Sequence, residues 1–176
     1  MNLPNKLTLL RVILIPLCIL LTLLNLNIAA AVIFAVAALT DFLDGYIARK
    51  QKIVTNFGKF ADPVADKILS LCMMIVLVYW TDFPWWAACI VAARELAVDG
   101  LRLVAVEQGI VIAAGNLGKI KTNFQFLSVL SALLKLPEGI TLSLCVVMSL
   151  LTVLSGAQYF IASKGLISPS KTKYNL

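Results

Sequence analysis

Residues 41–49 read DFLDGYIAR, and this stretch decides what the chain can fold into. It places Asp41 and Asp44 near the end of an otherwise apolar run, and Asp62 and Asp66 open the next apolar run. An ionised side chain near hydrocarbon costs about 2.5–3.5 kcal/mol at the centre of a helix. Four such carboxylates close together need positive counter-charge, and bound divalent cations would supply it.

The spacing of these residues indicates two helix faces. Asp41 and Asp44 are three residues apart, so a helix carries both on one face. Gly58, Asp62 and Asp66 recur every four residues, which again lines one face of a helix. Two regular spacings favour a cation site over the alternative, a buried network of ion pairs. The cations that such a network would use are Arg49, Lys59 and Lys67.

The composition is that of an integral membrane protein. Of 176 residues, 61% are hydrophobic and 14% are charged, whereas a soluble domain averages about 45–50% apolar and about 25% charged residues. The chain has no histidine, which excludes a His-ligated zinc site and a histidine general base. Any metal site is then expected to be all-oxygen, which suits Mg²⁺, Mn²⁺ or Ca²⁺. Four cysteines are scattered without a C-x-x-C pair, and we interpret them as reduced packing residues: Cys18, Cys72, Cys89 and Cys145.

Six apolar segments predict an all-α integral membrane protein with six transmembrane helices in one domain over residues 1–176. Each segment is near the length of about 20 residues that crosses a bilayer as a helix. Helices are required because backbone groups in lipid must be satisfied within the segment. A short amphipathic N-terminal segment is expected before the first span. The spans are predicted at residues 7–25, 28–48, 60–80, 84–107, 118–136 and 140–161.

Lysine and arginine fall almost entirely on one side of these predicted helices. The positive-inside rule then places both termini and the 49–59 loop in the cytoplasm. The opposite side carries an aromatic cluster, as an outer membrane interface does: Tyr79, Trp80, Phe83, Trp85 and Trp86. Both aspartate pairs are therefore expected near the cytoplasmic face of a cell membrane, where a lipid head group and a soluble metabolite can meet.

At these residues the chain resembles the CDP-alcohol phosphotransferases. It matches that family's signature, D-x2-D-G-x2-A-R-x8-G-x3-D-x3-D, at every fixed position: Asp41, Asp44, Gly45, Ala48, Arg49, Gly58, Asp62 and Asp66. Further blocks resemble the phosphatidylglycerophosphate synthase branch: residues 2–8, 62–67, 94–96 and 118–122. The likeness covers about residues 2–122, and the last two predicted helices look generic.

The resemblance implies an activity and roles for these residues. The expected reaction transfers the phosphatidyl group from CDP-diacylglycerol to sn-glycerol 3-phosphate, giving phosphatidylglycerol phosphate and CMP. Two Mg²⁺ or Mn²⁺ ions would be ligated by Asp41, Asp44, Asp62 and Asp66, and Asp66 would also be the catalytic base. The implied contacts with the CDP-alcohol are Asn5, Thr8, Gly45, Arg49, Thr55 and Gly58. A homodimer in the lipid bilayer is implied as well.

A basic site for the acceptor phosphate is predicted from the positions of four cations. Arg94 and Arg102 are eight residues apart on one helix face, and Lys119 and Lys121 lie at the start of the next predicted helix. A helix N-terminus adds a favourable dipole for an anion. The lysines could instead be membrane anchors, and the arginines part of a structural network. The carboxylates expected to orient the arginines are Glu95 and Asp99.

Other functions remain open at this level. Within the family the acceptor could be inositol phosphate, serine or phosphatidylglycerol. An intramembrane prenyltransferase also uses aspartate-rich motifs and Mg²⁺, but in a longer chain with more spans. A divalent-cation transporter would place acids near the midplane, often within internal repeats, and no repeat is visible here.

Overall fold

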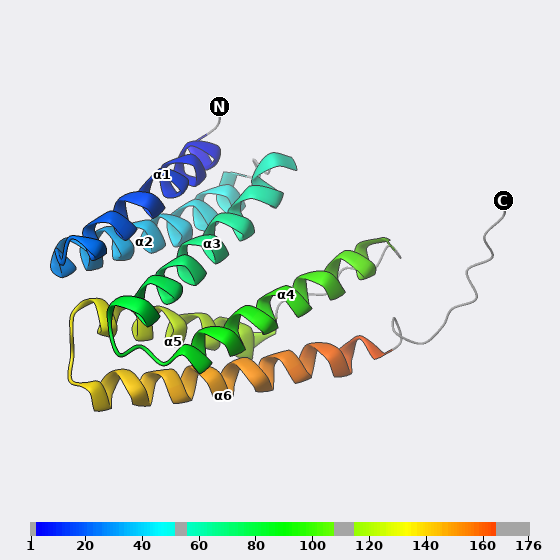
Figure 1. The fold of residues 1–176 in the computed structure, drawn as a ribbon. Helices are drawn as coiled ribbons and strands as arrows, with labels where there is room; N and C mark the ends of the chain where they lie inside the picture. Colours follow the sequence, from blue (N-terminus) through cyan, green and yellow to red (C-terminus); the bar gives the residue numbers. More distant parts are fainter. Residues whose placement is uncertain (1–2, 52–55, 108–114, 165–176) are drawn as a thin grey trace, which may run out of the picture.

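The computed structural model describes residues 3–51, 56–107 and 115–164. For residues 3–8, 41–51, 56–63 and 66 it describes the backbone but not the side chains. The regular structure of these ranges is entirely helical (Figure 1). The six helices are α1 (Leu3–Leu23), α2 (Asn27–Gln51), α3 (Asn56–Trp80), α4 (Trp85–Glu107), α5 (Asn116–Leu133) and α6 (Glu138–Ala162).

The helices form two groups of three. Helix α1 packs against α2 and α3, and α6 packs against both α4 and α5. The groups meet where α3 contacts α4 and α5 and where α2 contacts α5 (Figure 1). Phe34 of α2 stacks on Phe126 of α5, with ring centroids 4.5 Å apart. Helix α3 therefore lies at the centre, with the second aspartate pair near its start.

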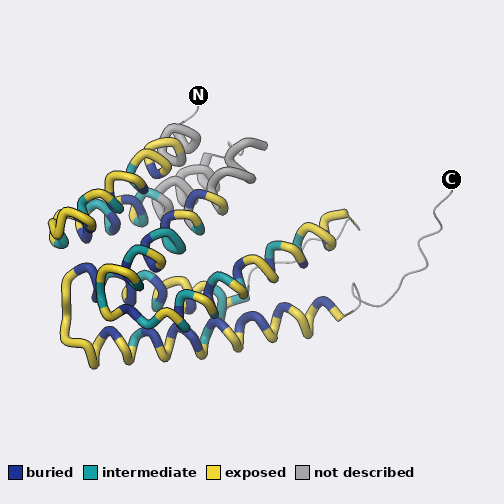
Figure 2. Tube along the Cα trace, viewed as in Figure 1, coloured by how far each residue is buried: buried dark blue, intermediate teal, exposed yellow. Residues whose placement is uncertain are grey.

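Large apolar side chains face outward, while many polar ones are buried. Figure 2 shows buried residues along one side of α6 and exposed residues along the other. Each helix exposes large apolar side chains, for example Ile13, Ile28, Ile75, Leu96, Leu127 and Leu150. The buried polar residues include Arg11, Glu95, Lys121, Gln125, Ser128 and Thr152. In soluble proteins charged side chains are almost never fully buried unless they are paired.

The six predicted segments are confirmed as six helices, with differences at their ends. Residues 3–8 are continuous with α1 and do not form a separate amphipathic segment. Pro4 does not interrupt this helix, because the first turn tolerates a residue without an N–H. Helix α5 ends at Leu133, short of the predicted 136, and Lys135 adopts a φ of 51° in the turn that follows.

Among the described residues, one helix, Glu138–Ala162, is long and apolar enough to cross a membrane by length and composition. Shorter apolar stretches lie within the first three helices: Leu9–Leu23, Asn27–Thr40 and Lys67–Trp80.

Candidate active site

The backbone places the signature residues on two helices and two further predicted contacts with the CDP-alcohol on a third. Helix α2 carries the 41–49 stretch, α3 carries Gly58, Asp62 and Asp66, and the first turns of α1 carry Asn5 and Thr8. For several predicted site residues the structure describes only the backbone: Asn5, Thr8, Asp41, Asp44, Gly45, Arg49, Gly58, Asp62 and Asp66. Thr55 lies wholly outside the described residues. Among the side chains that are described, no three His, Cys, Asp or Glu residues form a metal-binding group. The cation site stays a prediction.

Helix register connects the second aspartate pair to a cavity. Asp62, Asp66 and Ser70 follow one another at intervals of four in α3, so they share one face of that helix. Ser70 lines a cavity of about 200 Å³ between α3, α4, α5 and α6, and Lys67 lines it as well. The face of α3 that carries Asp66 therefore continues into the wall of this cavity.

The four basic residues that were predicted to bind the acceptor phosphate all line this cavity. Arg94 and Arg102 of α4 and Lys119 and Lys121 of α5 all line it. With Lys67 they make five cationic side chains, and among the side chains that the structure describes Glu95 is the one acidic residue in the lining. We call this space the basic cavity. Its strong excess of positive charge suits an anion.

Glu95 is the centre of an ion-pair network that joins three helices. It is only 6% exposed. Its carboxylate accepts a hydrogen bond from Lys121 of α5, lies 3.1 Å from Arg94 Nη1 and lies 3.5 Å from Nζ of Lys67 in α3. One carboxylate thus holds α3, α4 and α5 together beneath the basic cavity.

The expectation that Glu95 and Asp99 both orient the arginines is half right. Glu95 does bond to Arg94, but Asp99 pairs with Lys67. Asp99 lies one turn beyond Glu95 on α4, on the side that faces α3, and this places it beside Lys67 rather than Arg102. The two carboxylates therefore hold α4 against α3.

Tyr159 of α6 is a site residue that the sequence analysis missed. Its hydroxyl accepts a hydrogen bond of 2.7 Å from Arg102 Nη2. The guanidinium carbons of Arg94 and Arg102 each lie 5.3 Å from the centre of its ring. The signal was a hydroxyl-bearing aromatic residue three positions after Gly156 in a helix without lysine or arginine, a spacing that puts both on one face.

Three buried polar atoms around the cavity have no hydrogen-bond partner within the described part of the chain. They are Nε of Arg94, Nε of Arg102 and Oε1 of Gln125. Leaving such a group unsatisfied costs about 1–3 kcal/mol. These two donors and one acceptor are polar groups that the described part of the chain leaves without a partner beside the cavity.

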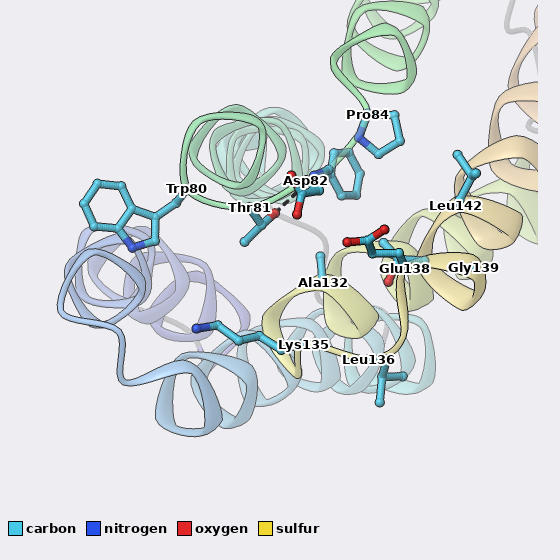
Figure 3. A pocket seen from close by; sticks show the side chains of 12 residues that line it. Trp80, Thr81, Asp82, Pro84, Ala132, Lys135, Leu136, Glu138, Gly139 and Leu142 are labelled. Atoms are coloured by element: carbon cyan, nitrogen blue, oxygen red, sulfur yellow. Dashed lines mark hydrogen bonds between the residues drawn. The ribbon is translucent and has the colours of Figure 1, made fainter.

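A second and larger cavity lies at the far ends of α3 and α5. It measures about 620 Å³ and is lined by the turn between α3 and α4 and the turn between α5 and α6. Figure 3 shows its charged side chains, Asp82, Lys135 and Glu138, with Lys135 extending away from Glu138. About half of its lining residues are aromatic or aliphatic, and none of the predicted site residues with a described side chain is among them.

Residues 1–158 match the protein family described as CDP-alcohol phosphatidyltransferase. The chain belongs to this family. The match confirms the resemblance carried by the 41–66 signature, and it runs through α6 almost to Tyr159. The chain is therefore an enzyme of the CDP-alcohol phosphatidyltransferase type.

Two relatives of this family member are similar over nearly their whole length. One is the CDP-diacylglycerol–glycerol-3-phosphate 3-phosphatidyltransferase of Bacillus subtilis (strain 168), 42% identical over 90% of this chain and 93% of that protein. The protein of the same name from Rickettsia typhi (strain ATCC VR-144 / Wilmington) is 36% identical over 93% of this chain and 97% of that protein.

Proposed function

We propose that this enzyme transfers the phosphatidyl group from CDP-diacylglycerol to sn-glycerol 3-phosphate, giving phosphatidylglycerol phosphate and CMP. The names of its relatives support this reaction. The structural observation that carries it is the basic cavity beside α3, which is lined by Arg94, Arg102, Lys119 and Lys121. A cavity with this charge, on the helix that carries Asp66, is where a phosphorylated acceptor could meet the CDP-activated lipid.

The chemistry of the cavity favours a phosphorylated polyol as acceptor. Phosphate oxygens accept hydrogen bonds from guanidinium groups in a matched, often bidentate geometry. Lys119 lies in the first turn of α5, where the helix dipole also favours an anion. The unpartnered Gln125 Oε1 needs a donor, and a hydroxyl is one. Serine has no phosphate for these cations, whereas inositol phosphate shares both groups and is the second candidate.

The reaction needs a proton acceptor and a stabilised leaving group. The C1 hydroxyl of glycerol 3-phosphate attacks the β-phosphorus of CDP-diacylglycerol and forms a new P–O bond. The bond from that phosphorus to the oxygen shared with the α-phosphate breaks, and CMP leaves with this oxygen. Without a histidine in the chain, a carboxylate takes the hydroxyl proton, and the family resemblance assigns this role to Asp66.

The four aspartates fit two hard cations as an all-oxygen donor set on adjacent helices. Asp41, Asp44, Asp62 and Asp66 would hold Mg²⁺ or Mn²⁺, which when bound neutralises phosphate charge and favours the deprotonated hydroxyl. The residues proposed to contact the CDP-alcohol are Asn5, Thr8, Gly45, Arg49, Thr55 and Gly58.

The proposal extends to location. The outward apolar side chains on every helix and the buried polar groups support six membrane-spanning helices in a cytoplasmic membrane. Both termini and the active site would face the cytoplasm, in keeping with the lysine and arginine distribution. A homodimer is part of the same proposal and rests on the family alone.

Purified protein tests the reaction when it is given CDP-diacylglycerol, Mg²⁺ and a panel of acceptors. We expect CMP release with glycerol 3-phosphate, little with serine or inositol phosphate, loss of activity with EDTA, and its return with Mg²⁺ or Mn²⁺. Release that depends on another acceptor would replace the substrate assignment. Mn²⁺ uptake into proteoliposomes without any CMP release would instead support a transporter.

Replacing Lys119 with Gln is expected to raise the KM for glycerol 3-phosphate about tenfold, because one charge-assisted hydrogen bond to the phosphate is lost. The KM for CDP-diacylglycerol should not change. Lys119 is the better choice of the two lysines, since it is exposed whereas Lys121 is bound to Glu95. Lys164→Gln is the matched control, an exposed lysine outside the cavity lining. An equal rise in both KM values would refute the assignment of Lys119.

A further inference from the structure

Helix α6 brings one aromatic side chain against both arginines of the basic cavity. Tyr159 is 5% exposed, and the guanidinium carbons of Arg94 and Arg102 each lie 5.3 Å from its ring centre. A cation over an aromatic face gains about 0.5–1 kcal/mol when exposed and about 2 kcal/mol or more when desolvated. The attraction of both arginines to one ring therefore offsets part of the repulsion between their like charges.

The hydroxyl of Tyr159 adds direction to this attraction. It accepts the 2.7 Å hydrogen bond from Arg102 Nη2, while Arg94 donates through Nη1 to the carboxylate of Glu95. These contacts use one Nη atom of each guanidinium, and both Nε atoms remain buried without a partner in the described part of the chain. Since a guanidinium has five N–H donors, each arginine keeps free donors for a ligand.

Gly156, one turn before Tyr159, gives Arg94 the room to lie in this position. A Cβ atom at residue 156 would come within 3.3 Å of Arg94 Cγ, closer than ordinary contact. The absence of a side chain lets the aliphatic part of Arg94 cross α6 directly. Gly156 and Tyr159 thus both contact the arginine pair from α6, a helix that carries no signature residue.

We propose that Tyr159 is a positioning residue that holds Arg94 and Arg102 as a two-arginine clamp for the acceptor phosphate, with Gly156 as the space that Arg94 occupies. This inference rests on the proposed function, because it assigns the clamp to glycerol 3-phosphate. The clamp faces the basic cavity between α3, α4, α5 and α6, whereas the residues proposed for the CDP-alcohol lie on α1, α2 and α3 and in the loop before α3. Loss of the clamp should therefore weaken the binding of glycerol 3-phosphate and leave the binding of CDP-diacylglycerol unchanged.

The test compares Tyr159→Leu, Tyr159→Phe and the control Phe160→Leu in the full-length protein. Phe160 is the next residue on α6 and is exposed, so it receives a comparable change outside the cavity. We expect Tyr159→Leu to raise the KM for glycerol 3-phosphate about tenfold. Tyr159→Phe keeps the ring, so it should recover part of this loss with a melting temperature near the wild-type value. The KM for CDP-diacylglycerol should stay near the wild-type value in both variants. Phe160→Leu should leave both KM values unchanged.

The outcomes separate this inference from the proposed function. Wild-type protein that does not use glycerol 3-phosphate overturns the proposed function. Wild-type turnover with an unchanged KM for glycerol 3-phosphate in Tyr159→Leu, or an equal rise in both KM values, overturns the clamp alone. If Tyr159→Leu does not fold, Gly156→Ala decides: it should displace Arg94 and raise the same KM selectively, and an unchanged KM in both Gly156→Ala and Tyr159→Phe overturns the clamp.

Discussion

Replacing Asp66 with Asn is expected to lower kcat by about 10²–10⁴-fold, the usual contribution of a general base. Asparagine has nearly the same shape but cannot take a proton from the attacking hydroxyl. It also weakens any cation site to which Asp66 belongs, because a neutral amide replaces a charged ligand. CMP release at saturating CDP-diacylglycerol, glycerol 3-phosphate and Mg²⁺ measures the effect.

Asp82→Asn is the matched control for Asp66→Asn. Asp82 is exposed and lines the cavity at the far ends of α3 and α5. We expect it to keep wild-type kcat, which shows that the loss is specific to the signature aspartate. Asp66→Asn that retains more than about one tenth of the wild-type kcat would exclude Asp66 as the base.

The sequence predicted the composition of the site better than its connections. Helical periodicity was sufficient to put Arg94 and Arg102 on one face of α4, and the position of Lys119 at a helix start was sufficient to suggest an anion site. The structure brings these residues to one cavity. Such patterns are local, since residues three, four or eight apart share a helix face whatever the helix packs against.

Contacts between helices could not be predicted in the same way. The pairs Lys67–Asp99 and Lys121–Glu95 join residues 32 and 26 positions apart. A single sequence shows which residues share a face, but not which helices have those faces in contact. Tyr159 was missed for this reason: only the packing of α6 against α4 brings it to the arginines.

Glu95→Gln is expected to destabilise the protein by about 3–5 kcal/mol, the cost of removing one partner from a buried ion pair. The substitution leaves Lys121, Arg94 and Lys67 around a neutral amide, and Lys121 is only 3% exposed. Its ammonium group would then be buried without its main counter-charge. Denaturant or thermal unfolding of the detergent-solubilised protein measures the loss, followed by tryptophan fluorescence.

Two further variants separate a buried network from general sensitivity of α4. Asp99→Asn removes the other carboxylate that contacts Lys67, but the Asp99 side chain is 41% exposed. It should therefore cost no more than about 1 kcal/mol. Adding Lys121→Gln to Glu95→Gln should recover part of the lost stability, because the double variant no longer buries the Lys121 charge beside a neutral amide. If Glu95→Gln costs no more than Asp99→Asn, or if the second substitution adds to the loss, the buried carboxylate does not hold α3, α4 and α5 together.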